Sequence, residues 1–588
     1  MTDARPNSHL PRATRWLALA LILAVGASLR FINVLDAGIF SVDEGRYLLD
    51  GQSKLAEMQV WSGLIRGKIG EIRGEHEFLL EEFVPEAHAR LARHAPFLPK
   101  VLFSYLVAGV MARTGFTVWA GNVVEAVFGV LMIWATYLLT SRVRNSRTGL
   151  IAAGMLAVSC YHVYFSRNAY PQCTSAFFLL VSVILHHTWR LRRTPERGAY
   201  PVLGASGVCA GLAFLANFQA GGALPLLVAI HLLACLGAPR RDAVRWFVAG
   251  GAVLAAAFAC TLCAAEAATY PLILLFRSQG LDYPHQTFIE LLLPRLGLHT
   301  SVKTNWQGIA LFPYFLWVFE GWAMAGALIA AGVGMWAAAR SRAHTGGAGG
   351  DRPAQVYPWF LRDGWVYLGA AFAVPWFVFS FKTLQGARTF VYIYPFFVAI
   401  LAVALDTAIG TGSRDRKAPV VWAAASLVLW VVPVLWKDVE VMRARSAYPD
   451  VMRYVAETDE RSATASWSAV LRCYLRANAL EEGPPYLVSD WQELYYGRYP
   501  DQPFRVPSDA TPEAEFAHRF GATFLRAELF PGYSRTFDAI RWTRALDLDR
   551  ATRVRVYDLR TVGPFDPDAN PPDAPLGWET YPGGDARR

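Results

Sequence analysis

The chain has 588 residues, of which 54% are hydrophobic and 18% are charged, and its mean hydropathy is +0.26. This composition, together with apolar runs of about 17 to 25 residues, excludes an ordinary soluble enzyme and predicts a protein that crosses a lipid bilayer many times. The formal net charge of +9 arises largely from arginines between the apolar runs. No RNA- or DNA-binding module is recognisable, so we expect no nucleic-acid partner.

Eleven apolar stretches are long enough to cross a bilayer as helices, which satisfy their own backbone hydrogen bonds in lipid. The predicted spans lie near residues 16–35, 118–140, 149–166, 173–190, 199–217, 221–238, 245–265, 309–338, 364–381, 390–409 and 418–436. Another apolar stretch, 97–113, is interpreted as an interfacial or re-entrant helix, because counting it as a span would put basic connections on both sides of the membrane. The predicted fold class is an α-helical polytopic membrane protein.

Clusters of basic residues fall on one side of the membrane if these spans are right. They are Arg5, Arg12 and Arg15; Arg142, Arg144 and Arg147; Arg190, Arg192, Arg193 and Arg197; Arg240, Arg241 and Arg245; Arg340, Arg342 and Arg352; and Arg414, Arg416 and Lys417. Positively charged connections stay in the cytoplasm, so this side and the N-terminus are predicted to be cytoplasmic. The opposite side receives residues 36–117, 167–172, 218–220, 266–308, 382–389 and the tail from 437. The first apolar run has no small-residue cleavage site after it and is expected to remain as a signal anchor.

The composition changes after Trp436 to charged residues, prolines and short apolar runs. Strands are expected near 486–489, 523–525 and 554–559, with a helix near 449–457. We therefore predict a transmembrane domain over 1–436, whose first extracytoplasmic loop is 36–117. A small α/β extracytoplasmic domain is predicted over 437–588.

The sequence offers little for metal or redox chemistry. Cys260 and Cys263 form a CxxC inside an apolar helix, where packing explains them better. The charged stretch 66–93 contains His76, Glu77 and His88, but without HExxH or another recognised ligand spacing. We expect no metal and no other cofactor, and an exposed amphipathic helix in this stretch.

The candidate chemistry lies in the predicted outer loops. Asp43 and Glu44 follow the first span and point about 100° apart if they are helical, so one can act as a general base while the other bonds a substrate or a basic neighbour. The alternative is that both only cap or solvate the start of a helix. Two other outer loops contain Arg167 to Gln172, and Lys382 to Arg388 followed by Tyr392. Lys382 and Arg388 can bind a phosphate, or they can extend to lipid headgroups.

These motifs resemble those of the GT-C superfamily of membrane glycosyltransferases, in particular the group of protein O-mannosyltransferases and bacterial lipid A aminoarabinose transferases. The resemblance spans roughly residues 16–436. It rests on Asp43-Glu44 with Arg46-Tyr47, His94-Ala95-Pro96, Ser166-Arg167, and the stretch from Lys382 to Pro395.

The resemblance implies an inverting transfer of a sugar from a polyprenyl-phosphate donor to an acceptor at the outer face of the membrane. Asp43 would be the general base and Glu44 a partner that orients the substrate. Residues implied to bind substrate are Arg46, Tyr47, His94, Arg167, Gln172, Lys382, Arg388 and Tyr392, among which Arg167, Lys382 and Arg388 would bind the lipid phosphate. Gln172 stands where many relatives have an acidic residue, which puts the role of a second carboxylate in doubt. The implied location is a bacterial inner membrane.

Two other classes of function stay open. A multi-pass transporter needs ionisable residues inside its spans, and Glu125 and Glu320 are the best evidence for one. A non-catalytic lipid-binding scaffold of the same fold would not need Asp43. The sugar and the acceptor, whether glycolipid, cell-wall polymer or protein, are also open.

Overall fold

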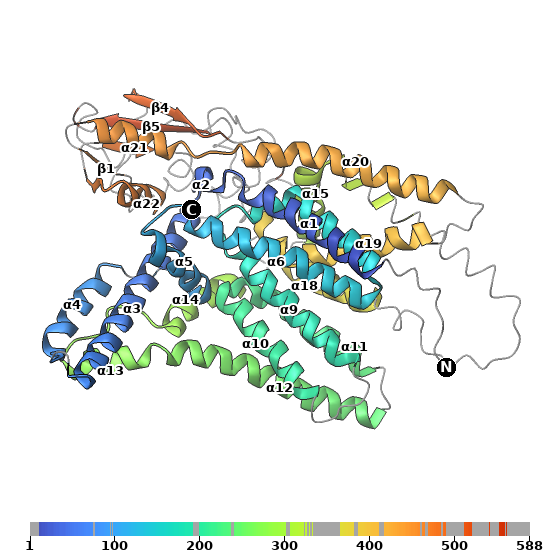
Figure 1. The fold of residues 1–588 in the computed structure, drawn as a ribbon, viewed down its shortest axis with the longest axis horizontal. Coiled ribbons are helices and arrows are strands. Elements are labelled where there is room, and N and C mark those ends of the chain that lie inside the picture. Colours follow the sequence, from blue (N-terminus) through green and yellow to red (C-terminus); the bar gives the residue numbers. More distant parts are fainter. Residues whose placement is uncertain are drawn as a thin grey trace, which may run out of the picture.

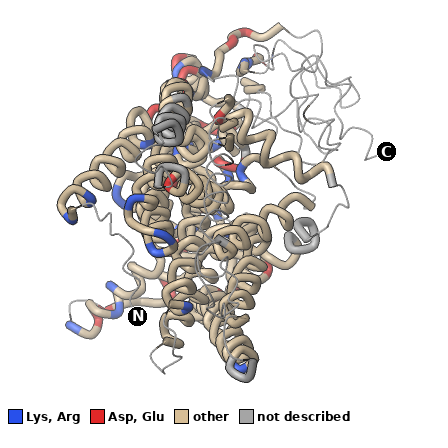
Figure 2. Tube along the Cα trace, turned by 90° about the vertical axis from the view of Figure 1, so that its right-hand side faces the viewer, with Lys and Arg blue, Asp and Glu red and all other residues tan. Residues whose placement is uncertain are grey.

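A computed structural model describes most of the chain. It covers residues 11–191 apart from 75, 76, 95 and 97, residues 199–236, 240–300, 306–322, 365–381, 386–410 and 417–458, and parts of 324–332 and 461–560. Long helices run side by side along its longest dimension (Figure 1). The chain in these helices is mostly uncharged, and several helix ends carry lysine or arginine (Figure 2).

The predicted spans are largely confirmed as helices. They correspond to α1 (Arg12–Phe31), α6 (Ala120–Val143), α9 (Gln172–Leu191), α10 (Tyr200–Ala216), α11 (Pro225–Leu236), α12 (Arg240–Ala267), α15 (Leu311–Glu320), α18 (Trp365–Ser380), α19 (Tyr394–Gly410) and α20 (Lys417–Met442). Among the described residues, four helical segments are long and apolar enough to cross a membrane by length and composition: Arg12–Ala37, Ala120–Val143, Phe218–Leu236 and Ala243–Ser278. Five further apolar helices among the described residues have 10–17 residues. The second half of the span expected over 309–338 lies largely outside the described residues.

One expected span, 149–166, is not a single helix. It consists of α7 (Ser146–Val158) and α8 (Cys160–Phe165), which are separated at Ser159. Ser159 has an extended backbone, and its side chain accepts a hydrogen bond from the N–H of His162, as an N-cap does. The apolar run hid this break because serine caps a helix without lowering the mean hydropathy much.

The first predicted outer loop contains α2 (Val34–Ala37), α3 (Val42–Ile72), α4 (Leu80–Ala92) and α5 (Val101–Thr114). Helix α4 is amphipathic, with Val84, Ala87 and Leu91 buried. Helix α5 has 14 residues, and at about 1.5 Å per residue it is shorter than a bilayer core of about 30 Å. It packs against α3, and it also contacts α6 and α10 of the bundle.

Two further helices, α13 (Tyr270–Ser278) and α14 (Phe288–Thr300), follow α12. Leu272 and Phe276 of α13 form one apolar cluster with α3 and α4. Helices α3, α4 and α13 therefore gather at one end of the bundle, together with the C-terminal sheet, while α12 and α20 begin at the opposite end (Figure 1).

The C-terminal part is a small α/β unit. It contains α21 (Tyr448–Glu457), β1 (Ser462–Thr464), α22 (Ala469–Ala477), β2 (Glu481–Glu482), β3 (Tyr486–Ser489), β4 (Ala514–Ala517) and β5 (Arg553–Asp558). The sheet order is β2-β1-β3-β5-β4, with β1 parallel to β2 and β3, and with β5 antiparallel to β3 and β4. The helix predicted near 449–457 and the strands near 486–489 and 554–559 are confirmed; residues 523–525 lie outside the described part.

A close contact joins this unit to α3. Gly45 lies so near the start of α22 that a Cβ there would be 2.6 Å from the carbonyl carbon of Ala469 and from the nitrogen of Val470. The Cys473 thiol also donates a hydrogen bond of 3.4 Å to the Gly45 carbonyl. Two backbones thus meet where only a glycine fits.

We expect Gly45→Ala to destabilise the protein by about 1–3 kcal/mol, because the backbone of α22 must move away. Gly109→Ala on α5 is the matched control, since a Cβ at Gly109 would meet nothing within 4 Å. Thermal unfolding of both purified variants measures the difference. Equal melting temperatures would contradict the close packing of α22 on α3.

Candidate functional site

The site is built at the N-terminus of α3. Ser41 is the N-cap, and its hydroxyl accepts a hydrogen bond from the N–H of Asp43 at 3.3 Å. Glu44 completes a capping box by accepting from the N–H of Ser41 at 3.0 Å. The first turn of the helix therefore holds Asp43 and Glu44 at the positive end of the helix dipole, where carboxylates are stabilised.

Asp43 is paired with arginines but stays accessible. Its carboxylate lies 2.7 Å from the guanidinium of Arg388 and 4.0 Å from that of Arg46, and its side chain is 27% exposed. Burial alone would raise the pKa of Asp43, but Arg388, Lys100 and Arg46 lower that pKa to about 2. The carboxylate is therefore ionised throughout the physiological range.

Aromatic rings and a lysine surround this pair. The Arg388 guanidinium lies 5.2 Å from the centre of the Tyr170 ring, and Tyr170 meets Tyr47 edge to face. Lys100 donates a hydrogen bond to the Tyr47 hydroxyl, and its ammonium lies 3.7 Å from the centre of that ring. The pKa of Tyr47 is raised, mainly by burial and to a smaller extent by the negative charge of Asp43, so its hydroxyl stays protonated.

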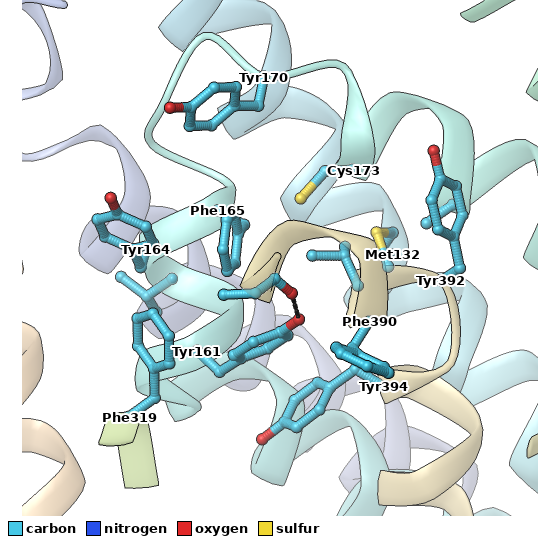
Figure 3. Packing of buried hydrophobic residues seen from close by; sticks show 14 of the residues in the cluster. Met132, Tyr161, Tyr164, Phe165, Tyr170, Cys173, Phe319, Phe390, Tyr392 and Tyr394 are labelled. Carbon is cyan, nitrogen blue, oxygen red and sulfur yellow. Dashed lines mark hydrogen bonds between the residues drawn. The ribbon is translucent and has the colours of Figure 1, made fainter. Parts of the chain in front are cut away.

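The backbone beside Arg388 is fixed from the aromatic core. Arg388 belongs to the 3-10 helix η4 (Ala387–Tyr392), and the carbonyl of Ala387 accepts a hydrogen bond of 2.5 Å from Tyr161 (Figure 3). Tyr161 packs against Tyr394 and Phe319, with ring centres 4.8 and 5.2 Å away. A buried aromatic cluster thus sets the position of the cation that holds Asp43.

Glu44 is buried and bonded to the backbone. Its carboxylate accepts hydrogen bonds from the N–H groups of Phe40 at 2.8 Å, Ser41 at 3.0 Å and Ala169 at 2.9 Å. The last bond crosses to the loop between α8 and α9. This geometry positions the two loops against each other.

Arg167 has a similar arrangement. It is 1% exposed, and its guanidinium donates to the carbonyls of Leu29, Arg30 and Ile32, between 2.7 and 3.1 Å. These carbonyls belong to the end of α1, where intrahelical donors are missing. Arg167 therefore caps α1, and these hydrogen bonds join it to α1 and not to Asp43.

The remaining predicted residues lie around this centre. Gln172 is fully buried at the start of α9, and neither amide atom has a hydrogen-bond partner among the described residues. Tyr392 is buried in η4 and packs on Phe379. His94 is partly buried; its pKa is lowered mainly by burial, and further by the positive charges of Arg476 and Arg93. Lys382 lies outside the described residues.

Two features of the site were missed in the sequence. Lys100 directly precedes the apolar helix α5, and its positive charge lowers the pKa of Asp43. A lysine at the border of a strongly apolar segment is visible in the sequence and could have been singled out as a candidate. Tyr170 was noted only as part of a polar loop, although it supports Arg388. Neither contact could be inferred from spacing, because each joins segments more than 50 residues apart.

A second buried ionic cluster lies further along α3. The Glu57 carboxylate accepts hydrogen bonds from Lys54 at 2.6 Å, Tyr105 at 2.8 Å and His285 at 3.0 Å. The other ring nitrogen of His285 faces the Leu91 carbonyl at 2.8 Å, so both nitrogens can donate only when the imidazole is protonated. This cluster joins α3 and α5 to the segment that follows α13.

The carboxylates proposed for a transporter are also engaged. Glu125 accepts from the N–H groups of Cys173 and Thr174 at the start of α9. Glu320 accepts from the Ser159 hydroxyl at 2.7 Å, the Tyr161 N–H at 3.1 Å and the Tyr394 hydroxyl at 3.0 Å. Both acids stabilise helix starts inside the bundle, and no observation on them favours transport.

Removing the charge of Glu57 is expected to destabilise the protein by about 3 kcal/mol, because Lys54 and His285 would lose their buried counter-ion. Burial alone would raise the pKa of Glu57, but His285 and Lys54 lower it to about 2, from the usual 4.5. The stabilisation is thus complete above pH 4.5 and disappears as the pH falls to about 2.

Thermal unfolding of Glu57→Gln at pH 7 and at several values down to about pH 2.5 measures this effect, and the deficit of the variant should shrink only below the usual pKa of 4.5. Glu71→Gln is the matched control, because Glu71 forms an exposed pair of 2.7 Å with Lys68 on the same helix, at the same spacing. Such a pair contributes about 0–1 kcal/mol. If both variants lost the same stability, the cluster would not be structural.

Part of the sequence matches a known protein family. Residues 95–264 match the family model described as dolichyl-phosphate-mannose-protein mannosyltransferase. No curated protein matches the chain significantly.

Several solved structures are similar over most of the chain. ArnT from Cupriavidus metallidurans in the apo state has a TM-score of 0.51 and 14% identity, covering 84% of this chain and 96% of that one. The same protein bound to undecaprenyl phosphate gives the same values. The apo oligosaccharyltransferase of Archaeoglobus fulgidus has a TM-score of 0.50 and 13% identity, covering 82% of this chain and 71% of that one. The family match over part of the chain and these shared folds confirm the resemblance inferred from the motifs: the chain is a helical membrane protein with the GT-C fold of membrane glycosyltransferases.

Proposed function

We propose that the chain is an inverting glycosyltransferase that moves a sugar from a polyprenyl-phosphate donor to a hydroxyl-bearing acceptor. The observation that carries this proposal is the partly exposed Asp43 carboxylate, which lies 2.7 Å from the guanidinium of Arg388. In the proposal, Asp43 is the base and Arg388 the cation that binds the donor phosphate. A polyprenyl-phosphate donor is supported by the ArnT structure bound to undecaprenyl phosphate and by the family name, which refers to a dolichyl-phosphate sugar.

In the proposed reaction, the acceptor oxygen attacks the anomeric carbon while Asp43 takes the hydroxyl proton. The bond between that carbon and the phosphate oxygen breaks, and its electron pair leaves with the polyprenyl phosphate. The sugar is inverted because attack and departure occur on opposite faces. Arg388, with Lys100 and the predicted Lys382, would stabilise the charge on the leaving phosphate.

The low pKa of Asp43 suggests how base and donor are coupled. A carboxylate with a pKa of about 2 is a weak base. When a donor phosphate binds Arg388, its negative charge offsets the cations around Asp43, and the pKa of Asp43 rises. The base would then become effective only when the donor is in place.

The other predicted residues take supporting roles in this proposal. Glu44 and Arg167 position the loops that carry Asp43 and Tyr170. Arg46, Tyr47, His94, Gln172 and Tyr392 stay candidates for substrate binding around the centre. The transmembrane part over 1–436 would sit in a bacterial inner membrane with its N-terminus in the cytoplasm, and the part over 437–588 would be periplasmic.

Asp43→Asn is expected to lower transfer about 10²–10⁴-fold, because the acceptor loses its base. The measurement is transfer of radiolabelled sugar from polyprenyl-phosphate donors in membranes that contain equal amounts of each protein. Glu86→Gln, an exposed acid of the same predicted loop that pairs with Arg90, is the control. Wild-type rates in the Asp43 variant would reject the enzyme proposal in favour of a scaffold.

A further inference from the structure

A second candidate site lies outside the Asp43 centre. A cavity of about 920 Å³ opens between the end of α1 with α2, the C-terminal end of α20 and the β-sheet unit. It shares no lining residue with the Asp43 centre. Its polar lining includes Asp36, Glu440, Arg443, Arg445 and Arg519.

Two of these arginines are held side by side by their backbones. Arg445 and Arg519 form an isolated antiparallel bridge in which each N–H donates to the other carbonyl at 2.9 Å. Residues paired in this way project their side chains from the same face, and like charges placed opposite each other are destabilising. An anion between them would remove that repulsion.

The protein itself neutralises these arginines only in part. Arg445 lies 3.8 Å from Asp450, at the limit of an ion pair. Within the described part of the chain, neither Arg443 nor Arg519 has a carboxylate at salt-bridge distance. Two guanidinium groups on the cavity wall are thus available to bind a phosphate with paired hydrogen bonds.

The rim of the cavity is apolar and exposed. Trp436, which lines the cavity, is 79% exposed, and Val432 one turn earlier on α20 is 63% exposed. Ile32 and Leu35, which adjoin the lining residues Asn33 and Asp36 in the chain, are 49% and 53% exposed. A tryptophan at the end of an apolar helix marks the boundary between membrane and water. The cavity therefore has basic groups at the level of lipid headgroups and an apolar edge on the side of the acyl chains.

We propose that this cavity binds the phosphate-bearing headgroup of a membrane phospholipid. Arg445 and Arg519 hold the phosphate together with Arg443, while Asp36 and Glu440 accept hydrogen bonds from an amine or hydroxyl of the headgroup. The acyl chains lie along the exposed face of α20. This site is independent of the transfer reaction, because it holds none of the residues assigned to it.

The test uses the full-length protein, purified and delipidated in detergent, and native mass spectrometry with phosphatidylethanolamine. The double variant Arg443→Gln and Arg519→Gln should bind at least about tenfold more weakly, since charge-assisted hydrogen bonds are lost. Arg453→Gln is the matched control, because Arg453 is an exposed arginine of α21 outside the cavity. Phosphatidylcholine, whose headgroup has no hydrogen-bond donor, should bind more weakly than phosphatidylethanolamine.

Two further arms separate the possible outcomes. Inorganic phosphate should displace the lipid only weakly; complete displacement at millimolar concentration would mean that the site recognises free phosphate, and would overturn the proposal. A phosphatidylethanolamine with a photoreactive acyl chain should label residues 428–442 of the wild-type protein. Unchanged binding by the double variant, or no labelling of this segment in the wild type, would also overturn it.

Discussion

The position of Asp43 depends on the buried carboxylate next to it. Glu44 collects backbone N–H groups from Phe40 and Ser41 on its own segment and from Ala169 on the loop between α8 and α9. Hydrogen bonds to a charged group contribute about 1.5–3 kcal/mol each, and leaving such donors unpaired in a buried place is costly. The loop fixed in this way carries Tyr170, on which the Arg388 guanidinium rests. One carboxylate therefore organises the surroundings of the other.

The same principle recurs inside the bundle. Glu320 bonds the groups around the break at Ser159, and Glu125 bonds the start of α9. Each acid stands where a helix begins and where backbone donors have no partner within the helix. Since lipid supplies no hydrogen bonds, irregular backbone at this depth needs such internal acceptors. The interrupted helix α7–α8 in turn carries Tyr161, which bonds the backbone beside Arg388.

Much of the helical framework was predictable, because long apolar runs in the sequence correspond to helices. The sequence also pointed to Asp43 and Arg388 as separate candidates in two outer loops. Their direct contact was not predictable, since it joins residues 345 positions apart through tertiary packing. The break at Ser159 escaped detection because a serine cap barely changes the hydropathy, and because Glu320, which accepts a hydrogen bond from Ser159, lies on a different helix. The structural use of Glu44 and Arg167 was likewise hidden, because a motif gives residue types but not the groups that they bond.

The capping role of Glu44 also fixes the order of the two acids. Exchanging them would preserve charge, composition and helix dipole, yet the carboxylate at the second position would be shorter by one methylene, about 1.5 Å. It could no longer span from α3 to the N–H of Ala169, while the longer acid at the first position would crowd Arg388. The dipeptide is therefore directional: its two members are chemically alike, but neither can substitute for the other.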